Sequence, residues 1–340
     1  MGVTHVAARL GRYKDIAWFL AKYARTDVLS ATDGEPADEH SAGDADAFAE
    51  DLKALGPTFI KLGQVLSTRP DLLPIRYLPA LAKLQDQVEP VDFSEIEAIV
   101  QEELGIRLSK AFDFFDQIPL AAGSLGQVHR ARLRGGREVA VKVQRPGVRE
   151  RVKGDLESFD EIARLLDHFS GAHRNFDARR TLEEFRQSLL AELDYTQEAR
   201  HLEAMSHQLR DFSNILVPLP VADYTTSRVL TMDFIEGTKV TAVSPVQWTE
   251  VDGGQLAEDL FRAYLKQILI DGTFHADPHP GNVFLTPDGR LALLDLGMVG
   301  RLSGPMQDRL FRLMLAIADG RGDEAASILI SLGETNDEFD

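Results

Sequence analysis

The stretch that decides the fold is Phe274-His275-Ala276-Asp277-Pro278-His279-Pro280-Gly281-Asn282, and it is followed by Leu293-Leu294-Asp295-Leu296-Gly297. Asp277 and Asn282 stand five positions apart, and Asp295 comes thirteen residues after Asn282. The residues between Asn282 and Asp295 have the pattern of two short strands joined by a turn at Pro287-Asp288-Gly289. This hairpin is expected to set Asn282 and Asp295 side by side.

The spacing suits phosphoryl transfer. Such a reaction needs a carboxylate near the attacking group and two oxygen ligands that fix Mg²⁺ against the phosphates of ATP. Asp277 can supply the carboxylate, and Asn282 and Asp295 can supply the two metal ligands. Their order along the chain is that of a kinase catalytic loop and its metal-binding aspartate. Two other interpretations are a Pro/Gly-rich surface loop that carries histidines by chance, and an unrelated metal site built from His275, Asp277 and His279. We favour the first interpretation because a second set of motifs lies upstream in the right order.

Composition and charge restrict the class of protein. The 340 residues suffice for two lobes and an extension, and 37 basic against 54 acidic residues give a net charge of −17. So acidic a surface argues against nucleic acid as the main partner, because phosphate backbones need clustered Lys and Arg. The sequence has no cysteine, which excludes disulfides and Cys-ligated metal sites. It shows no signal-peptide pattern and no long apolar run, so we expect a cytoplasmic protein without a membrane span.

The first 46 residues predict a helix and a linker. Residues 1–28 are expected to form an amphipathic helix, because basic residues alternate with an apolar stripe at helical spacing. This helix could lie on the inner face of a membrane, which would make the protein peripheral to it, or pack on the domain with its basic face in water. Residues 29–46 are small and acidic without an apolar period, and they predict a flexible linker.

A helical extension is expected over residues 47–111. The helical pattern runs to about Thr68 and is broken and restarted at Gly56-Pro57. In its second part Lys61 and Gln64 are three apart, which places them on a shared face. Asp92 has the position of a helix cap, and Gly105 that of a helix end.

From Phe112 the period changes to that of strands. Residues 112–120, 127–133 and 138–144 read as three antiparallel strands, and the first turn is Ala121-Ala122-Gly123-Ser124-Leu125-Gly126-Gln127-Val128. This turn matches the phosphate-covering G-x-G-x-x-G-x-V loop, except that Ala121 replaces the first glycine. Lys142 follows inside the apolar third strand, where a lysine must be paired or directed at phosphate because an ammonium alone is costly to bury.

Past an inserted helix at about 151–170, the pattern predicts one long helix from 177 to about 210. On it Asp194 and Glu198 are four apart and would repel each other unless a cation lies between them. Residues 217–221 and 228–234 are expected to complete the small sheet. The segment Met232-Asp233-Phe234-Ile235-Glu236-Gly237 is similar to a kinase hinge, whose backbone reads the adenine edge.

Taken together, these motifs resemble the UbiB family of atypical kinase-like proteins over about residues 50 to 300. The K-x-G-Q sequence at 61–64 and the E-x-D sequence at 192–194 are the most specific of them. The resemblance implies an α+β, protein-kinase-like, two-lobed fold whose N-terminal helical extension packs over the active site. It places a kinase-like N-lobe with a helical insertion at 112–237 and an incomplete kinase-like C-lobe at 238–340.

The resemblance also implies roles for single residues. Asp277, Lys142 and Glu198 would be catalytic, with Glu198 pairing Lys142, while Asn282 and Asp295 would hold Mg²⁺. Regulatory residues would be Lys61, Gln64, Glu192 and Asp194. The residues that would contact ATP, together with Lys142, are Ala121, Ala122, Gly123, Ser124, Gly126, Val128, Asp233 and Ile235.

The resemblance implies a protein that uses ATP and Mg²⁺ and supports the biosynthesis of ubiquinone or a related isoprenoid lipid. ATPase activity is expected in preference to peptide phosphorylation, and the expected partners are hydrophobic quinone intermediates and the enzymes that process them. One alternative is a small-molecule phosphotransferase of the aminoglycoside or choline kinase type, which also has a His-x-Asp-x-His-Pro-Gly-Asn sequence but lacks the Lys61 helix. Another is a nucleotide-switched, lipid-binding scaffold without turnover.

Overall fold

The computed structural model describes residues 2–23, 39–67, 69, 73–84, 88–169 and 176–333. The chain divides into two compact units. The first comprises residues 1–195 and 224–231, and the second comprises residues 196–223 and 232–340. Within the described residues, no helix is long and apolar enough to cross a membrane.

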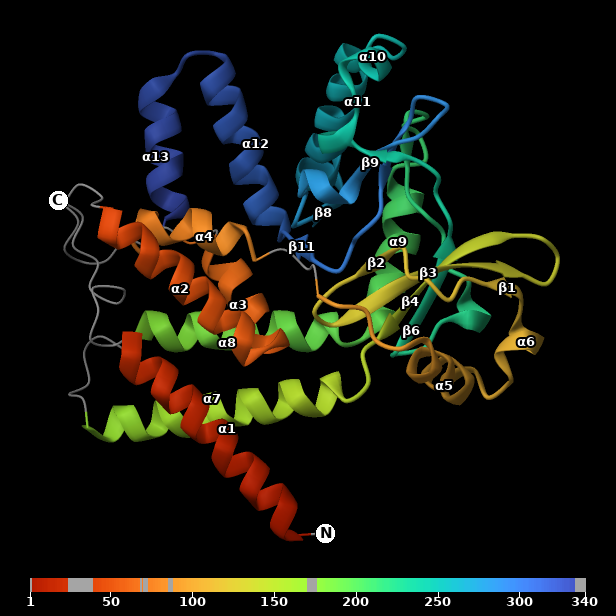
Figure 1. Cartoon of the computed structure of the whole chain (residues 1–340). Helices are drawn as coiled ribbons and strands as arrows, with labels where there is room; N and C mark the ends of the chain where they lie inside the picture. The colour runs from red at the N-terminus through yellow and green to blue at the C-terminus, as the bar shows by residue number, and fades with distance from the viewer. Residues whose placement is uncertain are drawn as a thin grey trace. The chain divides into compact units, whose positions relative to one another are not determined.

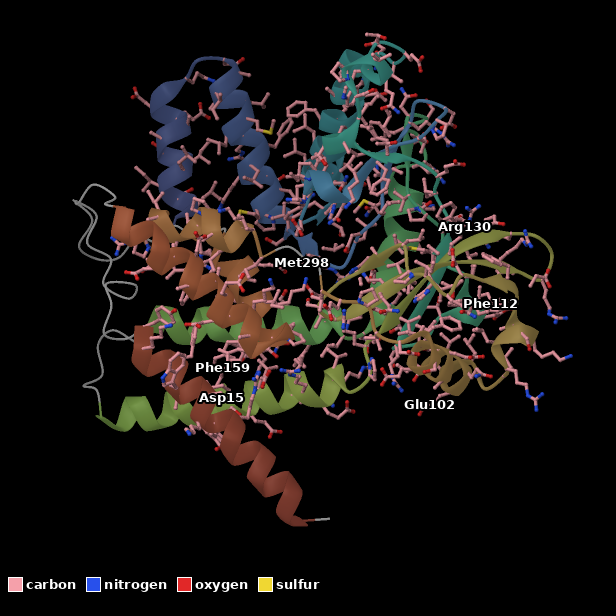
Figure 2. The ribbon with its side chains drawn as sticks, in the orientation of Figure 1. Asp15, Glu102, Phe112, Arg130, Phe159 and Met298 are labelled. Carbon is pink, nitrogen blue, oxygen red and sulfur yellow. The ribbon has the colours of Figure 1, made fainter. Side chains whose placement is uncertain are left out.

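The helices of the first unit that precede and follow its sheet form one apolar cluster (Figure 1). Phe59 of α3 is fully buried there, and its ring lies 5.1 Å from that of Phe159 of α7. Figure 2 labels Phe159. Phe19 of α1 stacks on Phe48 of α2 at 5.5 Å. These elements are α1 (Gly2–Tyr23), α2 (Glu39–Leu55), α3 (Pro57–Ser67), η1 (Ile75–Tyr77), α4 (Leu78–Ala82), α7 (Val148–Phe169) and α8 (Phe176–Glu192).

The apolar side of α1 is packed inside this cluster. Ile16, Phe19 and Tyr23 are buried, whereas Trp18 is 58% exposed. Of the two interpretations of this helix, packing on the domain is therefore the one that the structure supports. Burying an apolar stripe of this kind stabilises the fold by about 1.5–3 kcal/mol for each large side chain.

The predicted break between α2 and α3 is confirmed. Gly56 separates the two helices with φ of 99°, a left-handed conformation that favours glycine, and Pro57 opens α3. The predicted linker differs from the structure at its end, because α2 already begins at Glu39. Residues 29–38 lie outside the described residues. Ala45 is 2% exposed in the helical cluster, so its burial favours helix where the composition suggested a loop.

A five-stranded sheet forms the rest of the first unit, with strand order β1-β3-β4-β6 and β2 paired to β3. The predicted antiparallel strands are confirmed, although the first is shorter than expected. Asp92 caps α5, and Gly105 ends it in the left-handed region, as predicted. The elements are β1 (Phe112–Phe115), β2 (Ala121–Ala122), β3 (Gly126–Leu133), β4 (Glu138–Gln144), β6 (Val229–Asp233), α5 (Phe93–Leu104) and α6 (Leu108–Ala111).

The single long helix predicted for residues 177–210 is wrong, because the chain forms two helices, α8 and α9 (Tyr195–Gln208), with a break at Leu193-Asp194. The break is stabilised by groups distant in sequence. The Leu193 carbonyl accepts from Gln144 Nε2 at 2.7 Å, and the Tyr195 amide donates to the Ser227 carbonyl at 3.1 Å. These bonds replace those of a continuous helix.

The second unit contains α9, two small sheets and a series of helices. One sheet has the strand order β5-β10-β9-β7, and β11 pairs with β8 in the other. Residues 217–221, predicted as a strand, form only a bridge from Pro220 to Met232. The strands are β5 (Ile215–Leu216), β7 (Thr238–Lys239), β8 (Thr273–His275), β9 (Val283–Leu285), β10 (Leu291–Leu293) and β11 (Val299–Arg301). The helices are η2 (Ala222–Tyr224), η3 (Val240–Ala242), α10 (Pro245–Trp248), α11 (Gly253–Lys266), the π-helical turn η4 (Gln267–Asp271), η5 (Pro280–Asn282), α12 (Gly304–Ala318) and α13 (Gly322–Leu332).

Candidate active site

The β9–β10 hairpin sets Asn282 and Asp295 side by side, as the sequence predicts. Leu293 lies opposite Val283 in the antiparallel register, and the Leu294 amide donates to the Asn282 carbonyl at 3.0 Å. Asn282 thus lies opposite Leu294, the residue before Asp295, and both Asn282 and Asp295 are half-buried. An amide oxygen and a carboxylate are hard oxygen donors of the kind that Mg²⁺ prefers. The donor set therefore fits a magnesium ion.

Gly297 orients the carboxylate of Asp295. Its amide donates to Asp295 Oδ1 at 2.9 Å, and a Cβ atom on Gly297 would lie 3.2 Å from the same oxygen. A side chain at position 297 would therefore displace the carboxylate by a few tenths of an ångström. Gly297 was not among the predicted site residues, although an aspartate followed two positions later by glycine is a recognisable signal.

The Asp277 loop is shaped by His279. The His279 amide donates to the Asp277 carbonyl at 2.8 Å, and His279 Nδ1 accepts from the Gly281 amide at 3.0 Å. Asp277 itself is exposed, so its carboxylate is accessible to a reacting group. Within the described residues no group of three or more His, Cys, Asp or Glu could hold a metal ion, which argues against a site built from His275, Asp277 and His279.

Behind this loop lies a buried polar layer. His275 is 3% exposed, and burial lowers the pKa of its imidazole. Its amide donates to Oε1 of the buried Gln267 at 3.0 Å, which ties β8 to η4. The Tyr264 hydroxyl is buried without a hydrogen-bond partner among the described residues. Burial, and to a smaller extent the charge of Asp277, raise the pKa of Tyr264 to about 12.

In the first unit, the strand register brings together Ala121, Val128 and Lys142. Val128 stands opposite both Ala121 of β2 and Lys142 of β4. Directly opposed residues of an antiparallel pair project from the same face of the sheet. The Lys142 ammonium lies 5.2 Å from the ring centroid of Tyr195, within the range of a cation–π contact. The predicted loop and lysine thus share one face.

The loop at 121–126 is held in place by Arg145, which the sequence reasoning missed. The Gly123 amide donates to the Gly126 carbonyl at 2.8 Å, and Arg145 Nε donates to the Gly123 carbonyl at 2.8 Å. Ser124 and Leu125 are buried, and burial lowers the pKa of Arg145. A loop bound in this way is pre-ordered.

Gly126 is required by a close approach. A Cβ atom there would lie 2.5 Å from the Tyr195 hydroxyl oxygen and 2.6 Å from the Val143 carbonyl oxygen. Since the carbonyl belongs to the backbone of β4, it cannot move aside cheaply. Gly126 therefore lets the loop, β4 and Tyr195 meet.

Gln127 and His129 lie on the opposite face of β3. Gln127 Oε1 accepts from the Val91 amide at 2.9 Å, and Gln127 Nε2 lies 2.9 Å from His129 Nε2. The other ring nitrogen, Nδ1, lies 2.8 Å from the Asp116 carbonyl and donates to it. Burial lowers the pKa of His129, in keeping with a neutral ring. These residues secure the chain before α5 to the sheet.

The K-x-G-Q sequence forms contacts within the first unit. Lys61 Nζ lies 3.1 Å from Glu192 Oε2, which joins the two motifs that the sequence singled out. Gln64 Nε2 donates to the Leu84 carbonyl at 2.9 Å. A Cβ atom on Gly63 would lie 2.4 Å from Leu84 Cδ1, so the glycine permits close helix packing. A position of these residues over the nucleotide remains a prediction.

The remaining predicted site residues are placed as follows. Asp194 lies in the break between α8 and α9, so the prediction that it shares a helix face with Glu198 is wrong. Glu198 is buried in the first turn of α9, and its pairing with Lys142 remains a prediction. The Asp233 amide donates to the Leu219 carbonyl at 3.0 Å. A contact of Asp233 and Ile235 with an adenine edge remains a prediction.

The sequence matches a family model, the ABC1 atypical kinase-like domain, over residues 83–328. It is similar to "Protein ACTIVITY OF BC1 COMPLEX KINASE 8, chloroplastic" of Arabidopsis thaliana, with 40% identity over 84% of this chain and 38% of that protein. An uncharacterized protein of Synechocystis is 38% identical over 84% of this chain and 72% of that protein. Another of the same organism is 37% identical, and the chain spans 50% of its length.

A solved structure is also similar. It is Rv3197 of Mycobacterium tuberculosis in complex with erythromycin, with a TM-score of 0.57 and 28% sequence identity. The similarity covers 82% of this chain and 70% of that one.

Proposed function

Since the chain belongs to the ABC1 atypical kinase-like family, the UbiB type, we propose that it binds Mg-ATP and acts as an ATP-dependent phosphotransferase or ATPase. The observation that carries this proposal is the hairpin that aligns Asn282 with Asp295, together with the amide of Gly297 that orients the carboxylate. A magnesium ion bound there would neutralise charge on the phosphates. Asn282 and Asp295 would hold it.

The protein residues have separate tasks in this proposal. Asp277 accepts the proton of the attacking hydroxyl or water, for which its exposed position is suited. Lys142 contacts the phosphates and pairs with Glu198, and the loop at 121–126 covers them with its backbone. Preordering of that loop by Arg145 lowers the entropic cost of binding.

The substrate class belongs to the same proposal. Ubiquinone or a related isoprenoid lipid is the compound whose synthesis the protein would support, in keeping with its family resemblance. A peptide substrate is disfavoured because β11 begins two residues after Gly297 and α12 begins at Gly304, which leaves little loop for a peptide platform. The complex of Rv3197 with erythromycin supports the view that this fold can receive a non-peptide ligand.

Asp295→Asn tests the metal assignment. We expect this variant to lose the thermal stabilisation that Mg-ATP gives to the parent, because an amide offers a neutral oxygen where a divalent ion needs charge. Asp308→Asn, on the exposed face of α12, is the matched control and should retain the full stabilisation. If Asp295→Asn is stabilised by Mg-ATP as strongly as the parent, Asp295 does not hold the metal.

A further inference from the structure

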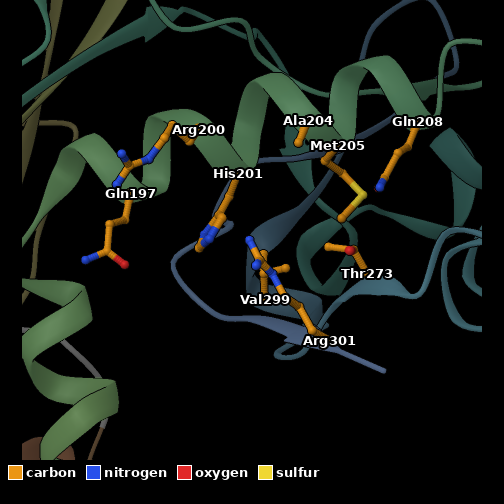
Figure 3. A pocket seen from close by; sticks show the side chains of 9 residues that line it. All are labelled: Gln197, Arg200, His201, Ala204, Met205, Gln208, Thr273, Val299 and Arg301. Carbon is orange, nitrogen blue, oxygen red and sulfur yellow. The ribbon is translucent and has the colours of Figure 1, made fainter. Parts of the chain in front are cut away.

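A polar pocket lies within the second unit, between α9 and the pair of strands β8 and β11 (Figure 3). Its volume is about 380 Å³, which lies within the range of small-molecule sites. Six of its nine lining residues share one face of α9, and the others come from β8 and β11. They are Gln197, Arg200, His201, Ala204, Met205, Gln208, Thr273, Val299 and Arg301.

The charge of this pocket is opposite to that of the chain. Arg200 and Arg301 line it and none of the nine lining residues is acidic, although the chain carries a net charge of −17. Both arginines are exposed, and neither forms an ion pair with a carboxylate among the described residues. Two cationic side chains without a carboxylate partner, at one cavity, favour an anion.

The hydrogen-bond donors of the pocket come from α9, β8 and β11. Arg301 stands opposite Thr273 in the register of β11 and β8, so their side chains project from one face. His201 Nδ1 lies 3.1 Å from the Leu296 carbonyl and donates to it, which leaves Nε2 on the other side of the ring. The fork of a guanidinium matches the oxygens of a phosphate group, to which it can donate two hydrogen bonds.

The inner wall of the pocket supplies apolar contacts and one buried acceptor. Met205 is 1% exposed and, with Ala204 and Val299, gives the pocket an apolar wall. Gln208 Oε1 is buried without a hydrogen-bond partner among the described residues. A buried acceptor left unpaired destabilises the fold, and a ligand hydroxyl that donates to it would remove that cost.

We propose that this pocket is a second ligand site, which binds a small phosphorylated hydroxyl compound. The phosphate lies between Arg200 and Arg301, and a hydroxyl of the ligand donates to Gln208 Oε1. The site is distinct from the Asn282–Asp295 pair, which uses acidic and amide oxygens to hold a cation. The shared chemistry is a phosphomonoester, whether it is offered by a free compound or by a lipid headgroup.

The test is calorimetric titration of the full chain with glycerol 3-phosphate, without nucleotide or magnesium and at constant ionic strength. We expect saturable binding that Arg200→Gln and Arg301→Gln each weaken by about tenfold or more, because charge-assisted hydrogen bonds are lost. Binding should disappear in the double variant. Arg312→Gln, an exposed arginine of α12, is the matched control and should bind like the parent.

Two further binding measurements distinguish the possible outcomes. Asp295→Asn should bind glycerol 3-phosphate like the parent, so this result is independent of the proposed ATP site. Vesicles that contain phosphatidic acid test the source of the phosphate. If the parent binds these vesicles but not glycerol 3-phosphate, and the double variant does not bind the vesicles, the phosphomonoester belongs to a lipid. The proposal is overturned if the parent binds neither probe, or if the double variant keeps its binding while melting like the parent.

Discussion

At the scale of the residue, the candidate site depends on glycines as much as on charged side chains. Gly297 donates to Asp295 and leaves room for its carboxylate, and Gly126 lets the loop approach β4. Both positions contribute because they have no side chain. Residue types such as Asp and Lys are conspicuous in a sequence, whereas the need for a missing Cβ becomes evident only when the neighbouring atoms are in place.

We expect Gly297→Ala to weaken Mg-ATP binding by about tenfold, because the new methyl group would lie 3.2 Å from Asp295 Oδ1 and displace it by a few tenths of an ångström. Titration calorimetry with Mg-ATP measures the change. The control is Gly304→Ala at the start of α12, where a Cβ atom meets nothing within 4 Å. Equal affinities in the two variants would contradict the orienting role of Gly297.

Tyr264 offers a test of stability at the same scale. Its buried hydroxyl lacks a partner among the described residues, so Tyr264→Phe removes an unpaired group and should change the free energy of unfolding by less than about 1 kcal/mol. Denaturant titration measures the change. A loss of several kcal/mol would mean that the hydroxyl has a partner in solution, for which a bound water is the simplest candidate.

At the scale of the element, the sequence pattern predicted those helix breaks, strands and turns whose signal lies within a few neighbouring residues. Gly56-Pro57 broke the helix, the strand period marked β3 and β4, and the Pro287-Asp288-Gly289 turn joined β9 to β10. The break between α8 and α9 could not be predicted in this way. Its hydrogen-bond partners, Gln144 and Ser227, lie some 30 to 50 residues away along the chain, so they act only after the sheet has formed.

The sequence left the role of α1 open for a related reason. A basic amphipathic helix has the same pattern whether its apolar side faces a membrane or a protein core. The choice is made by Phe48 and Phe59, whose rings lie 5.5 Å and 6.0 Å from Phe19. Such partners come from other elements and cannot be read from the helix itself.

The helix α3 allows the K-x-G-Q sequence to be tested. We expect Lys61→Ala to change ATP hydrolysis or autophosphorylation while it lowers the free energy of unfolding by no more than about 1 kcal/mol, because the Lys61–Glu192 pair is partly solvated. The control is Lys53→Ala on α2, whose pair with Glu50 is exposed. A large loss of stability with unchanged ATP handling would show that Lys61 is structural.

At the scale of the whole molecule, the interior of the first unit combines two kinds of contact. It is centred on aromatic and aliphatic side chains, but it also contains a buried ionic junction between α1, α3 and α7. Asp155 is 1% exposed and accepts from Arg12 Nε at 2.6 Å, from Arg12 Nη2 at 2.8 Å and from Thr58 Oγ1 at 2.5 Å. Arg12 Nη2 also donates to the Leu55 carbonyl at 2.7 Å, at the end of α2.

This junction predicts a large effect for one substitution far from the candidate site. Arg12→Ala should lower the free energy of unfolding by about 3–5 kcal/mol, because it leaves the Asp155 carboxylate buried without its cation. Denaturant titration gives the value, and hydrogen exchange should show the loss in α1, α3 and α7. The control is Lys83→Ala, whose pair with Asp46 is exposed on both sides.

A double-mutant cycle separates the contribution of the ion pair from that of the packing of the Arg12 side chain. If the cost of Arg12→Ala comes from an uncompensated carboxylate, it must shrink when Asp155→Ala is already present. A cost that stays the same in both backgrounds would assign it to lost packing of the Arg12 stem over Phe59, whose ring centroid lies 5.3 Å from the guanidinium carbon.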